Sequence, residues 1–449
     1  MTTLVLSPAY ASHYGPLSTI GRALDRRGER VVIATGSALE GQVRRDGFEW
    51  RELVLGRGIN TGISRPHDQA PEEARHLERF FAATAEGPVA TLELQAERRR
   101  DDLLWQPEVA ARQLAQVIAD VRPETILTDH IALSATLALR ALGLPFVTYV
   151  PGHPSQLPVA DEVYGAPTAW PRIVRPSRRD DERLQALCRA ITASVAHDFN
   201  RALAKINPSA APVADPFREH GELTLFGYSR ALHDPARERL LPENCRFVGP
   251  CVRDEILPVD LEPWVAGIGN APLVYVSLGT FLSARGDILR TLVDALRPMP
   301  VHVAIASGLT PADQLGAVPE NWLVAPILPQ VAILNHARLA ITHAGNNSVG
   351  EASRAGLPMI ALPLSTDQFA IAADLERTGA AICLNPNALN VDGLRAAISA
   401  LVERSPENGA VGNGAGAAAD AILDRGRLSW PRRGVTSSEF TPQMSSPRE

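Results

Sequence analysis

Residues 341–351 read ITHAGNNSVGE, and this stretch decides the fold that the sequence predicts. An apolar strand precedes His343, Gly345 permits a tight turn, and Asn347 with Ser348 opens a helix. This geometry directs free backbone N–H groups and the positive end of the helix toward one place, which suits a phosphate. His343 can donate a hydrogen bond to the same anion, and the Ser348 hydroxyl can add another. The other interpretation is a helix cap formed by Asn347 and Ser348 beside a structural histidine.

Strand and helix patterns alternate on both sides of this stretch. One α/β series runs from Leu4 to Val150, and a second runs from Leu273 to Arg377. Such alternation is typical of parallel sheets, and the turn-rich residues 251–270 between the series predict an interdomain linker. The expected organisation is a domain at 1–250, a linker at 251–270, a domain at 271–404, and a helix with a disordered tail at 405–449.

Composition favours a large globular core and a weakly acidic surface. The chain has 449 residues, of which 45% are hydrophobic and 21% are charged. With 44 basic and 50 acidic residues its formal net charge is −6, which argues against an electrostatic grip on nucleic acid or an anionic membrane. Lys205 is the one lysine, and we interpret the arginine excess as the mark of a GC-rich genome. No arginine is among the candidate site residues below.

The sequence lacks the motifs of a leader peptide, a membrane span and a metal site. Residues 1–6 carry no leader pattern, and the most apolar long window, 131–150, is interrupted by Arg140, Gly143 and Pro145. The cysteines are scattered without a C-x-x-C pair, and neither an H-E-x-x-H motif nor an Asp-x-Asp triplet occurs. We expect a cytoplasmic protein without a metal, a membrane span or a nucleic-acid partner.

Two neighbouring segments strengthen the signal of residues 341–351. Residues 326–336 read PILPQVAILNH, and residues 358–368 read PMIALPLSTDQ. The run 329–368 resembles the C-terminal signature of family-1 glycosyltransferases, P-Q…L…H…T-H-x-G…S…E…G-x-P…P…D-Q, and is more similar to the bacterial natural-product branch than to the plant branch. The resemblance implies the GT-B fold, in which two Rossmann-like α/β domains with parallel sheets face each other across a cleft. It also implies a nucleotide-sugar donor used without a metal.

The resemblance implies a donor site in the C-terminal domain. Its residues would be Thr280, Gln330, His343, Gly345, Asn347, Ser348, Glu351, Asp367 and Gln368. The diphosphate would be held by His343, Asn347 and Ser348 around the turn at Gly345. Thr280, after the first strand of this domain, stands where the family has another phosphate contact.

Other positions of the signature would recognise the nucleoside and the sugar. Glu351 would accept hydrogen bonds from ribose hydroxyls, and Asp367 with Gln368 would bond the sugar hydroxyls. The backbone of Pro326 to Gln330 would meet the base, but Ile327 stands where the plant pattern has a base-stacking tryptophan, so the base is left open. Together, Glu351 and the Asp367–Gln368 pair favour a UDP-hexose over a dTDP-deoxysugar, which presents fewer hydroxyls.

The N-terminal half offers the catalytic candidates. Residues 12–16 read SHYGP and resemble the family's G-H-x-x-P, with Ser12 in place of glycine. His13 would be the general base that deprotonates the acceptor, because an ordinary histidine pKa of about 6.5 suits proton transfer at neutral pH. Asp129 would be its partner, fixing the tautomer of the imidazole and stabilising the imidazolium. Asp129 could instead cap the helix that follows it.

The sequence thus predicts an inverting, metal-independent hexosyltransferase that takes a nucleotide sugar, preferably a UDP-sugar, as co-substrate and needs no cofactor. The acceptor would be a hydroxyl or amine of a small natural product, in a pocket shaped by loops 56–105 and 152–176. The aromatic candidates for its walls are Trp105, Tyr149, His153 and Trp170. The alternatives are a catalytically silent protein that binds nucleotide sugars on the same fold, and a transferase for dTDP-deoxysugars. Either a monomer or a homodimer is compatible with the sequence.

Overall fold

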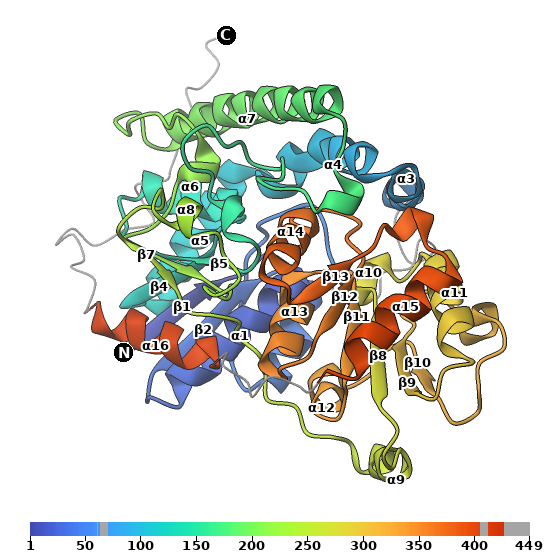
Figure 1. Ribbon diagram of the computed structural model, residues 1–449. Helices are drawn as coiled ribbons and strands as arrows, with labels where there is room; N and C mark the ends of the chain where they lie inside the picture. The colour runs from blue at the N-terminus through green and yellow to red at the C-terminus, as the bar shows by residue number, and fades with distance from the viewer. Residues whose placement is uncertain (61, 63–70, 405–411, 426–449) are drawn as a thin grey trace.

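Two parallel β-sheets, one in each half of the chain, organise the computed structural model (Figure 1). The structure describes residues 1–60, 62, 71–404 and 412–425. Apolar clusters lie on both faces of each sheet, so the central strands are mostly buried, as parallel strands covered on both faces require, whereas the edge strand β3 (Glu49–Glu52) is polar. The predicted pair of Rossmann-like α/β units is therefore present.

The first sheet has seven strands in the order β3-β2-β1-β4-β5-β6-β7. They are β1 (Thr2–Leu6), β2 (Arg30–Thr35), β3 (Glu49–Glu52), β4 (Thr125–Asp129), β5 (Val147–Val150), β6 (Leu223–Phe226) and β7 (Cys245–Phe247). The helices of this half are α1 (Ala11–Asp25), α2 (Glu40–Arg45), α3 (Pro71–Glu86), α4 (Pro88–Leu103), α5 (Pro107–Val121), α6 (Leu133–Ala141), α7 (Arg178–Ile206) and α8 (Pro235–Glu238). Val5 packs into the core beside α1, whereas Leu4 and Leu6 pack into the core beside α5.

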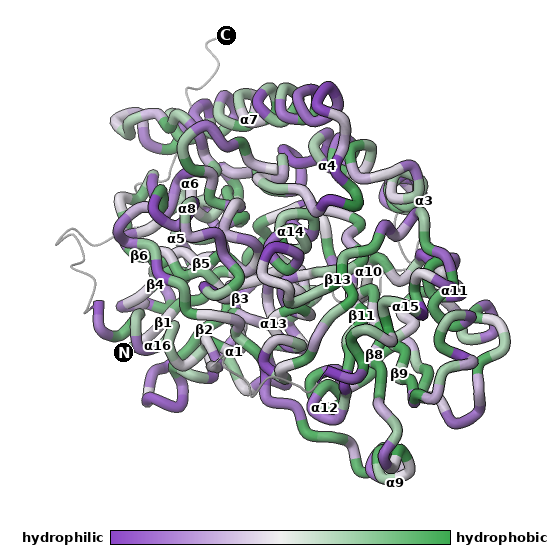
Figure 2. Tube along the Cα trace, viewed as in Figure 1, coloured by the Kyte–Doolittle hydropathy of each residue, from purple (hydrophilic) through white to green (hydrophobic). Residues whose placement is uncertain are grey.

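The second sheet has six strands in the order β10-β9-β8-β11-β12-β13. They are β8 (Leu273–Ser277), β9 (His302–Ala306), β10 (Leu323–Ala325), β11 (Leu339–Thr342), β12 (Met359–Ala361) and β13 (Ala381–Cys383). Its helices are α10 (Gly279–Leu282), α11 (Gly286–Leu296), α12 (Gln330–Leu334), α13 (Asn346–Arg354), α14 (Gln368–Thr378) and α15 (Val391–Val402). Figure 2 shows hydrophobic colour along β8, β9 and β11. β13 and α15 have no counterpart among the predicted elements.

Both sheets reverse their winding direction beside their first strand. β1 lies between β2 and β4, with Leu6 opposite Thr128, and β8 lies between β9 and β11, with Ser277 opposite Thr342. In open α/β sheets a ligand binds outside the carboxyl ends of the strands at such a point. The loops after β1, β4, β8 and β11 are therefore the segments that can build a site.

The C-terminal helix α16 (Gly414–Asp424) returns to the first half of the chain and packs on α1, as Figure 1 shows. Ala418, Ala419 and Ile422 join the core of the first sheet. The sequence predicted a helix in 405–449 but not this docking, and residues 405–411 and 426–449, including the predicted tail, lie outside the described residues. Residues 251–270 contain the short helix α9 (Glu262–Gly267).

The strands of the first sheet end at Phe247 and those of the second begin at Leu273, while the exact domain boundaries stay a prediction. Over the ranges that the structure describes, no helix combines the length and the apolar character needed to cross a membrane.

Candidate active site

A cleft of about 780 Å³ runs between the two sheets and is lined by both halves of the chain. His13 and Gln156 line it from the first half, and His343, Glu351 and Asp367 line it from the second. The cleft therefore gathers loops from the carboxyl ends of both sheets.

His13 and Asp129 come together because β1 and β4 are neighbouring parallel strands. His13 lies in the first turn of α1, and its Nδ1 atom is 2.8 Å from Oδ2 of Asp129, the last residue of β4. The second carboxylate oxygen accepts the backbone N–H of Ile131 at 3.0 Å. The next helix, α6, has Ala132 as its N-cap, so Asp129 does not cap it.

The surroundings of this pair favour the protonated form of the histidine. Asp129 is fully buried, whereas the side chain of His13 is 17% exposed. Burial alone lowers the pKa of His13, but the charge and hydrogen bond of Asp129, with a smaller effect of Asp367, raise that pKa above its ordinary value. Because Nδ1 faces the carboxylate, Nε2 is the ring nitrogen that can take a proton from a molecule in the cleft.

The N-terminus of α13 lies against the N-terminus of α1. α13 begins at Asn346 with Gly345 as its N-cap, and no described side chain caps it. The interpretation in which Asn347 and Ser348 form the cap is therefore wrong, because both lie inside the first turn. The Asn347 amide instead donates a hydrogen bond of 2.9 Å to the carbonyl of Ser12, directly before the histidine of the pair. The positive end of α13 is thus held next to that histidine.

His343 packs between two glycines at the ends of β8 and β11. A Cβ atom on Gly279 would lie 2.7 Å from Cε1 of the His343 ring, and Gly279 has a φ of +73°, so this position requires glycine. Burial lowers the pKa of His343 to about 4, which leaves the ring neutral at neutral pH with one N–H to donate. The side chain of Thr280 lies outside those that the structure describes, so its phosphate contact stays a prediction.

Glu351 is held in α13 by two partners. Its Oε1 atom is 2.7 Å from a guanidinium nitrogen of Arg253, and Gln330 donates to Oε2. Gln330 also accepts the hydroxyl of Tyr275 at 3.0 Å. Burial raises the pKa of Glu351, and the charge of Arg253 opposes this. Sequence reasoning missed Arg253, which lines the cleft from the linker, where no motif pointed to it.

Asp367 and Gln368 follow β12 and differ in what they contact. Oδ2 of Asp367 accepts the backbone N–H of His153, from the first half of the chain, at 2.7 Å. The Gln368 amide stays within its own loop, where its oxygen accepts two backbone N–H groups and its nitrogen donates to Ser365. Asp367 therefore reaches across the domain interface, whereas Gln368 shapes the loop that carries it.

The chain matches a family model and several known proteins. Residues 196–408 match the family model described as UDP-glucoronosyl and UDP-glucosyl transferase. The oleandomycin glycosyltransferase of Streptomyces antibioticus is 31% identical over 361 residues, which are 79% of each chain. The chain belongs to the family-1 glycosyltransferases. The predicted family and the predicted transferase class are thus confirmed.

Other relatives of this glycosyltransferase cover nearly its whole length. The uncharacterized UDP-glucosyltransferase YojK of Bacillus subtilis (strain 168) is 26% identical over 428 residues, 92% of this chain and 94% of its own. The solved glycosyltransferase of kitacinnamycin has a TM-score of 0.64 and 20% identity over 95% of both chains. The calicheamicin glycosyltransferase CalG4 has a TM-score of 0.62 and 20% identity over 94% of both. These structures confirm the predicted GT-B fold.

The wall of the cleft on the N-terminal side differs from the prediction for this glycosyltransferase. Within the described part of the chain, none of the four aromatic candidates, Trp105, Tyr149, His153 and Trp170, lines the cleft. Tyr149 is 1% exposed because it lies on a central strand, where its ring fills the core. The side chains that do line this wall include Tyr10, Leu77, Phe80, Leu92 and Tyr164. Four of them come from the predicted loop ranges 56–105 and 152–176.

Proposed function

We propose that this glycosyltransferase moves a hexose from a nucleotide sugar to a hydroxyl or amine of a small natural product, with inversion at the anomeric carbon. The observation that carries the proposal is the pair of His13 and Asp129, which opens onto the cleft beside the N-terminus of α13. A relative named for oleandomycin, and structural neighbours named for kitacinnamycin and calicheamicin, support an acceptor of this class. The apolar wall of the cleft also suits such a molecule.

Proton transfer begins the proposed reaction. The acceptor hydroxyl or amine gives its proton to Nε2 of His13 while its heteroatom forms a bond to the anomeric carbon. The bond between that carbon and the diphosphate oxygen breaks with its electron pair on the diphosphate. Attack from the side opposite the leaving group inverts the anomeric configuration. Asp129 keeps the ring in the productive tautomer and stabilises the imidazolium that forms.

The leaving diphosphate meets fixed donors in this proposal. The backbone N–H groups of the first turn of α13 and the positive end of the helix lie beside the cleft. The neutral ring of His343 supplies a further N–H, and Ser348 supplies a hydroxyl. Because these donors are already oriented, they stabilise the developing charge without reorganising, which supports a mechanism independent of a metal.

Two kinds of donor, a UDP-hexose and a dTDP-deoxysugar, are each favoured by specific observations. The carboxylates of Glu351 and Asp367 line the cleft and favour a UDP-hexose, which has more hydroxyls to bond. A dTDP-deoxysugar donor is favoured by two other observations: both oxygens of Glu351 already have partners, and the Gln368 amide is engaged in its own loop. Structural neighbours solved with thymidine diphosphate, SpnG and VinC, share the fold.

Calorimetry with UDP and dTDP, followed by mass spectrometry of reactions with their hexoses and deoxyhexoses, tests the proposal. We expect UDP to bind more tightly and a macrolide acceptor to gain the mass of a hexose. Tighter binding of dTDP with transfer of a deoxyhexose would select the rival donor. Binding of neither nucleotide would contradict the proposed function.

A further inference from the structure

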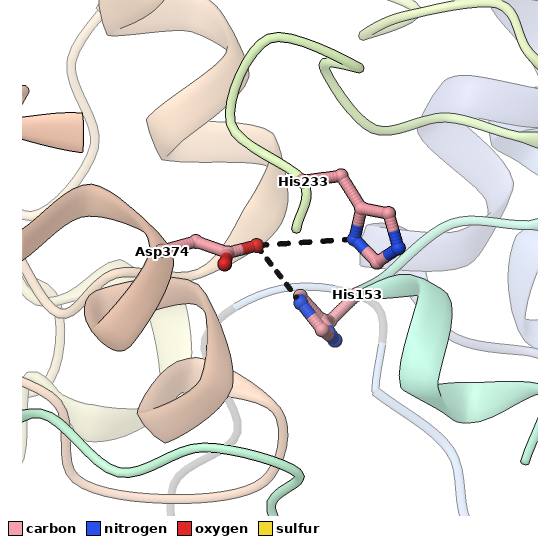
Figure 3. Close-up of side chains that lie close together, drawn as sticks. All are labelled: His153, His233 and Asp374. Carbon is pink, nitrogen blue, oxygen red and sulfur yellow. Dashed lines mark hydrogen bonds and ion pairs between the residues drawn. The ribbon is translucent and has the colours of Figure 1, made fainter. Parts of the chain in front are cut away.

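Three buried polar side chains meet at the domain interface behind the cleft. His153 follows β5, His233 follows β6, and Asp374 lies on α14; they are 3%, 2% and 5% exposed. Figure 3 shows both imidazole rings turned toward the same oxygen of Asp374. The cluster therefore links two loops of the acceptor half to one helix of the donor half.

The two histidines of this cluster differ in their hydrogen bonding. Nε2 of His153 lies 3.1 Å from Oδ2 of Asp374, and Nδ1 of the same ring accepts the backbone N–H of Ser155 at 3.1 Å. Because Nδ1 accepts this N–H, Nε2 is the ring nitrogen that carries a proton and donates it to the carboxylate. Nδ1 of His233 is 3.9 Å from that oxygen, and neither nitrogen of His233 has a hydrogen-bond partner in the described chain.

Two imidazoles and a carboxylate can bind zinc in other proteins. Here the hydrogen bonds to Asp374 favour a structural network without a metal. Arg377 donates to Oδ1 of Asp374 at 3.1 Å, and Tyr228 donates to Oδ2 at 3.0 Å. Burial raises the pKa of Asp374, yet the hydrogen bonds from His153, Arg377 and Tyr228 hold that pKa below its ordinary value. The carboxylate is thus ionised, neutralised by a guanidinium, and engaged by three donors.

His153 also contacts the donor site through its backbone. Its N–H donates to Oδ2 of Asp367 at 2.7 Å, and the amide of Gln156, three residues on, approaches the same oxygen at 3.4 Å. The other oxygen of Asp367 accepts the hydroxyl of Thr366 at 3.1 Å. Asp367 is the N-cap of α14, and Asp374 lies seven residues later on that helix. His153 is therefore held twice by α14, by its ring and by its N–H.

We propose that His153 is a positioning residue for the donor sugar. The bond from its ring to Asp374 fixes the loop after β5, so that its backbone N–H orients the carboxylate of Asp367 at the cleft. This inference rests on the proposed role of Asp367 in binding the sugar hydroxyls. It adds a residue that touches neither substrate and acts through the domain interface.

Loss of the His153 ring should affect the KM of the donor sugar and not the binding of UDP or the acceptor. In His153→Leu the loop loses its anchor, and Asp367 loses its fixed orientation. We expect the KM for the UDP-hexose to rise about tenfold, the effect of one charge-assisted hydrogen bond. The Kd of UDP and the KM of the acceptor should stay unchanged, because neither molecule carries the donor sugar. His153→Gln, whose amide N–H can replace Nε2, should restore most of the donor affinity.

His233 supplies a matched control, because it faces the same carboxylate. His233→Leu makes the same substitution, removes two nitrogens that lack partners among the described residues, and should leave the KM for the donor unchanged. Asp374→Asn weakens the group that accepts the hydrogen bond of the His153 ring, so it should also raise the KM for the UDP-hexose. This second variant tests the inference if His153→Leu fails to fold.

A double-mutant cycle decides whether His153 acts through Asp367. If it does, His153→Leu should add less than twofold to the KM of the donor once Asp367→Asn is present. Full additivity, or an equal loss of UDP and UDP-hexose binding, would overturn the inference. Stoichiometric zinc in the purified protein, lost from both leucine variants, would overturn it in favour of a metal site. A wild-type protein that transfers no sugar from any nucleotide donor would contradict the proposed function itself.

Discussion

Nδ1 of His13 and Oδ2 of Asp129 lie 2.8 Å apart, although 116 residues separate them in the chain. They meet because β1 and β4 are adjacent and parallel at the point where the first sheet reverses its winding. The buried carboxylate is itself oriented by the N–H of Ile131. The histidine is thus fixed in orientation and tautomer before any substrate binds.

Removal of the imidazole should stop chemistry without affecting the nucleotide. For His13→Ala we expect kcat to fall by about 10²–10⁴, the usual contribution of a general base. The Kd of UDP, measured by calorimetry, should stay within about twofold of wild type, because the donor site is built from the other domain. Near-normal turnover by this variant would refute the catalytic assignment.

The pH dependence of kcat/KM should report the raised pKa of His13. A general base works only when deprotonated, so activity should rise with pH, with a midpoint above the ordinary histidine value of about 6.5. Asp129→Asn removes the charge that raises this pKa and should move the midpoint to lower pH while lowering kcat. A midpoint that stays in place or moves upward would contradict the coupling of the two groups.

Arg253 should matter for the nucleotide, because it orders Glu351. In Arg253→Met the buried carboxylate loses a partner, and we expect the Kd of UDP to rise about tenfold. Because the side chain of Glu351 is 6% exposed and keeps only Gln330 as a partner among the described residues, the loss of stability should be about 1–3 kcal/mol. Asp254 lies in the same linker and forms an exposed ion pair with Arg26 at the end of α1. Asp254→Asn is therefore the control and should leave UDP binding intact.

His233 should make the protein less stable in acid. Burial lowers the pKa of His233 to about 3, whereas in the unfolded chain it takes a proton below about 6.5. Stability from this group is therefore complete above about 6.5 and is lost as the pH falls toward 3. Between about pH 7 and pH 5, the Tm of His233→Leu should fall less than that of wild type. An equal fall in both proteins would contradict a buried, neutral His233.

α16 should contribute to the stability of the N-terminal core and not to catalysis. Ile422 is 2% exposed against α1, so Ile422→Ala should cost roughly 2–4 kcal/mol in urea unfolding and leave kcat unchanged. Asp420, whose side chain is 61% exposed beside Arg27, is the control, and Asp420→Ala should cost less than about 1 kcal/mol. A stable Ile422→Ala variant would show that the helix is dispensable to the fold.

The sequence predicted those parts of the site that depend on strand order. Short apolar strands followed by helix patterns indicated the ends of β1, β4 and β11, and parallel sheets bring such ends to one edge. His13, Asp129 and His343 therefore fall where the sequence predicted, although their roles in catalysis and binding stay predictions. The helix cap at Asn347 was wrong because the N-cap is Gly345, two residues earlier, which places the Asn347 side chain in the first turn.

Contacts between distant segments could not be read from the sequence. Arg253 lies in a linker without periodicity, and its pairing with Glu351 depends on how the linker passes α13. His153 was predicted to line the acceptor pocket but is buried against Asp374, because the loop after β5 turns toward the donor domain. The docking of α16 on α1 joins residues 393 apart, as in the bond between Arg27 and Asp420, and no local pattern encodes such a contact.

The most direct test of the central claim is the anomeric configuration of the product. UDP-α-glucose would be incubated with the enzyme and a macrolide acceptor, and the glycoside would be examined by NMR. Inverting transfer with His13 as base predicts a β-glucoside that forms with the wild-type enzyme and is lost in His13→Ala. An α-glucoside, or equal product from the variant, would contradict the account.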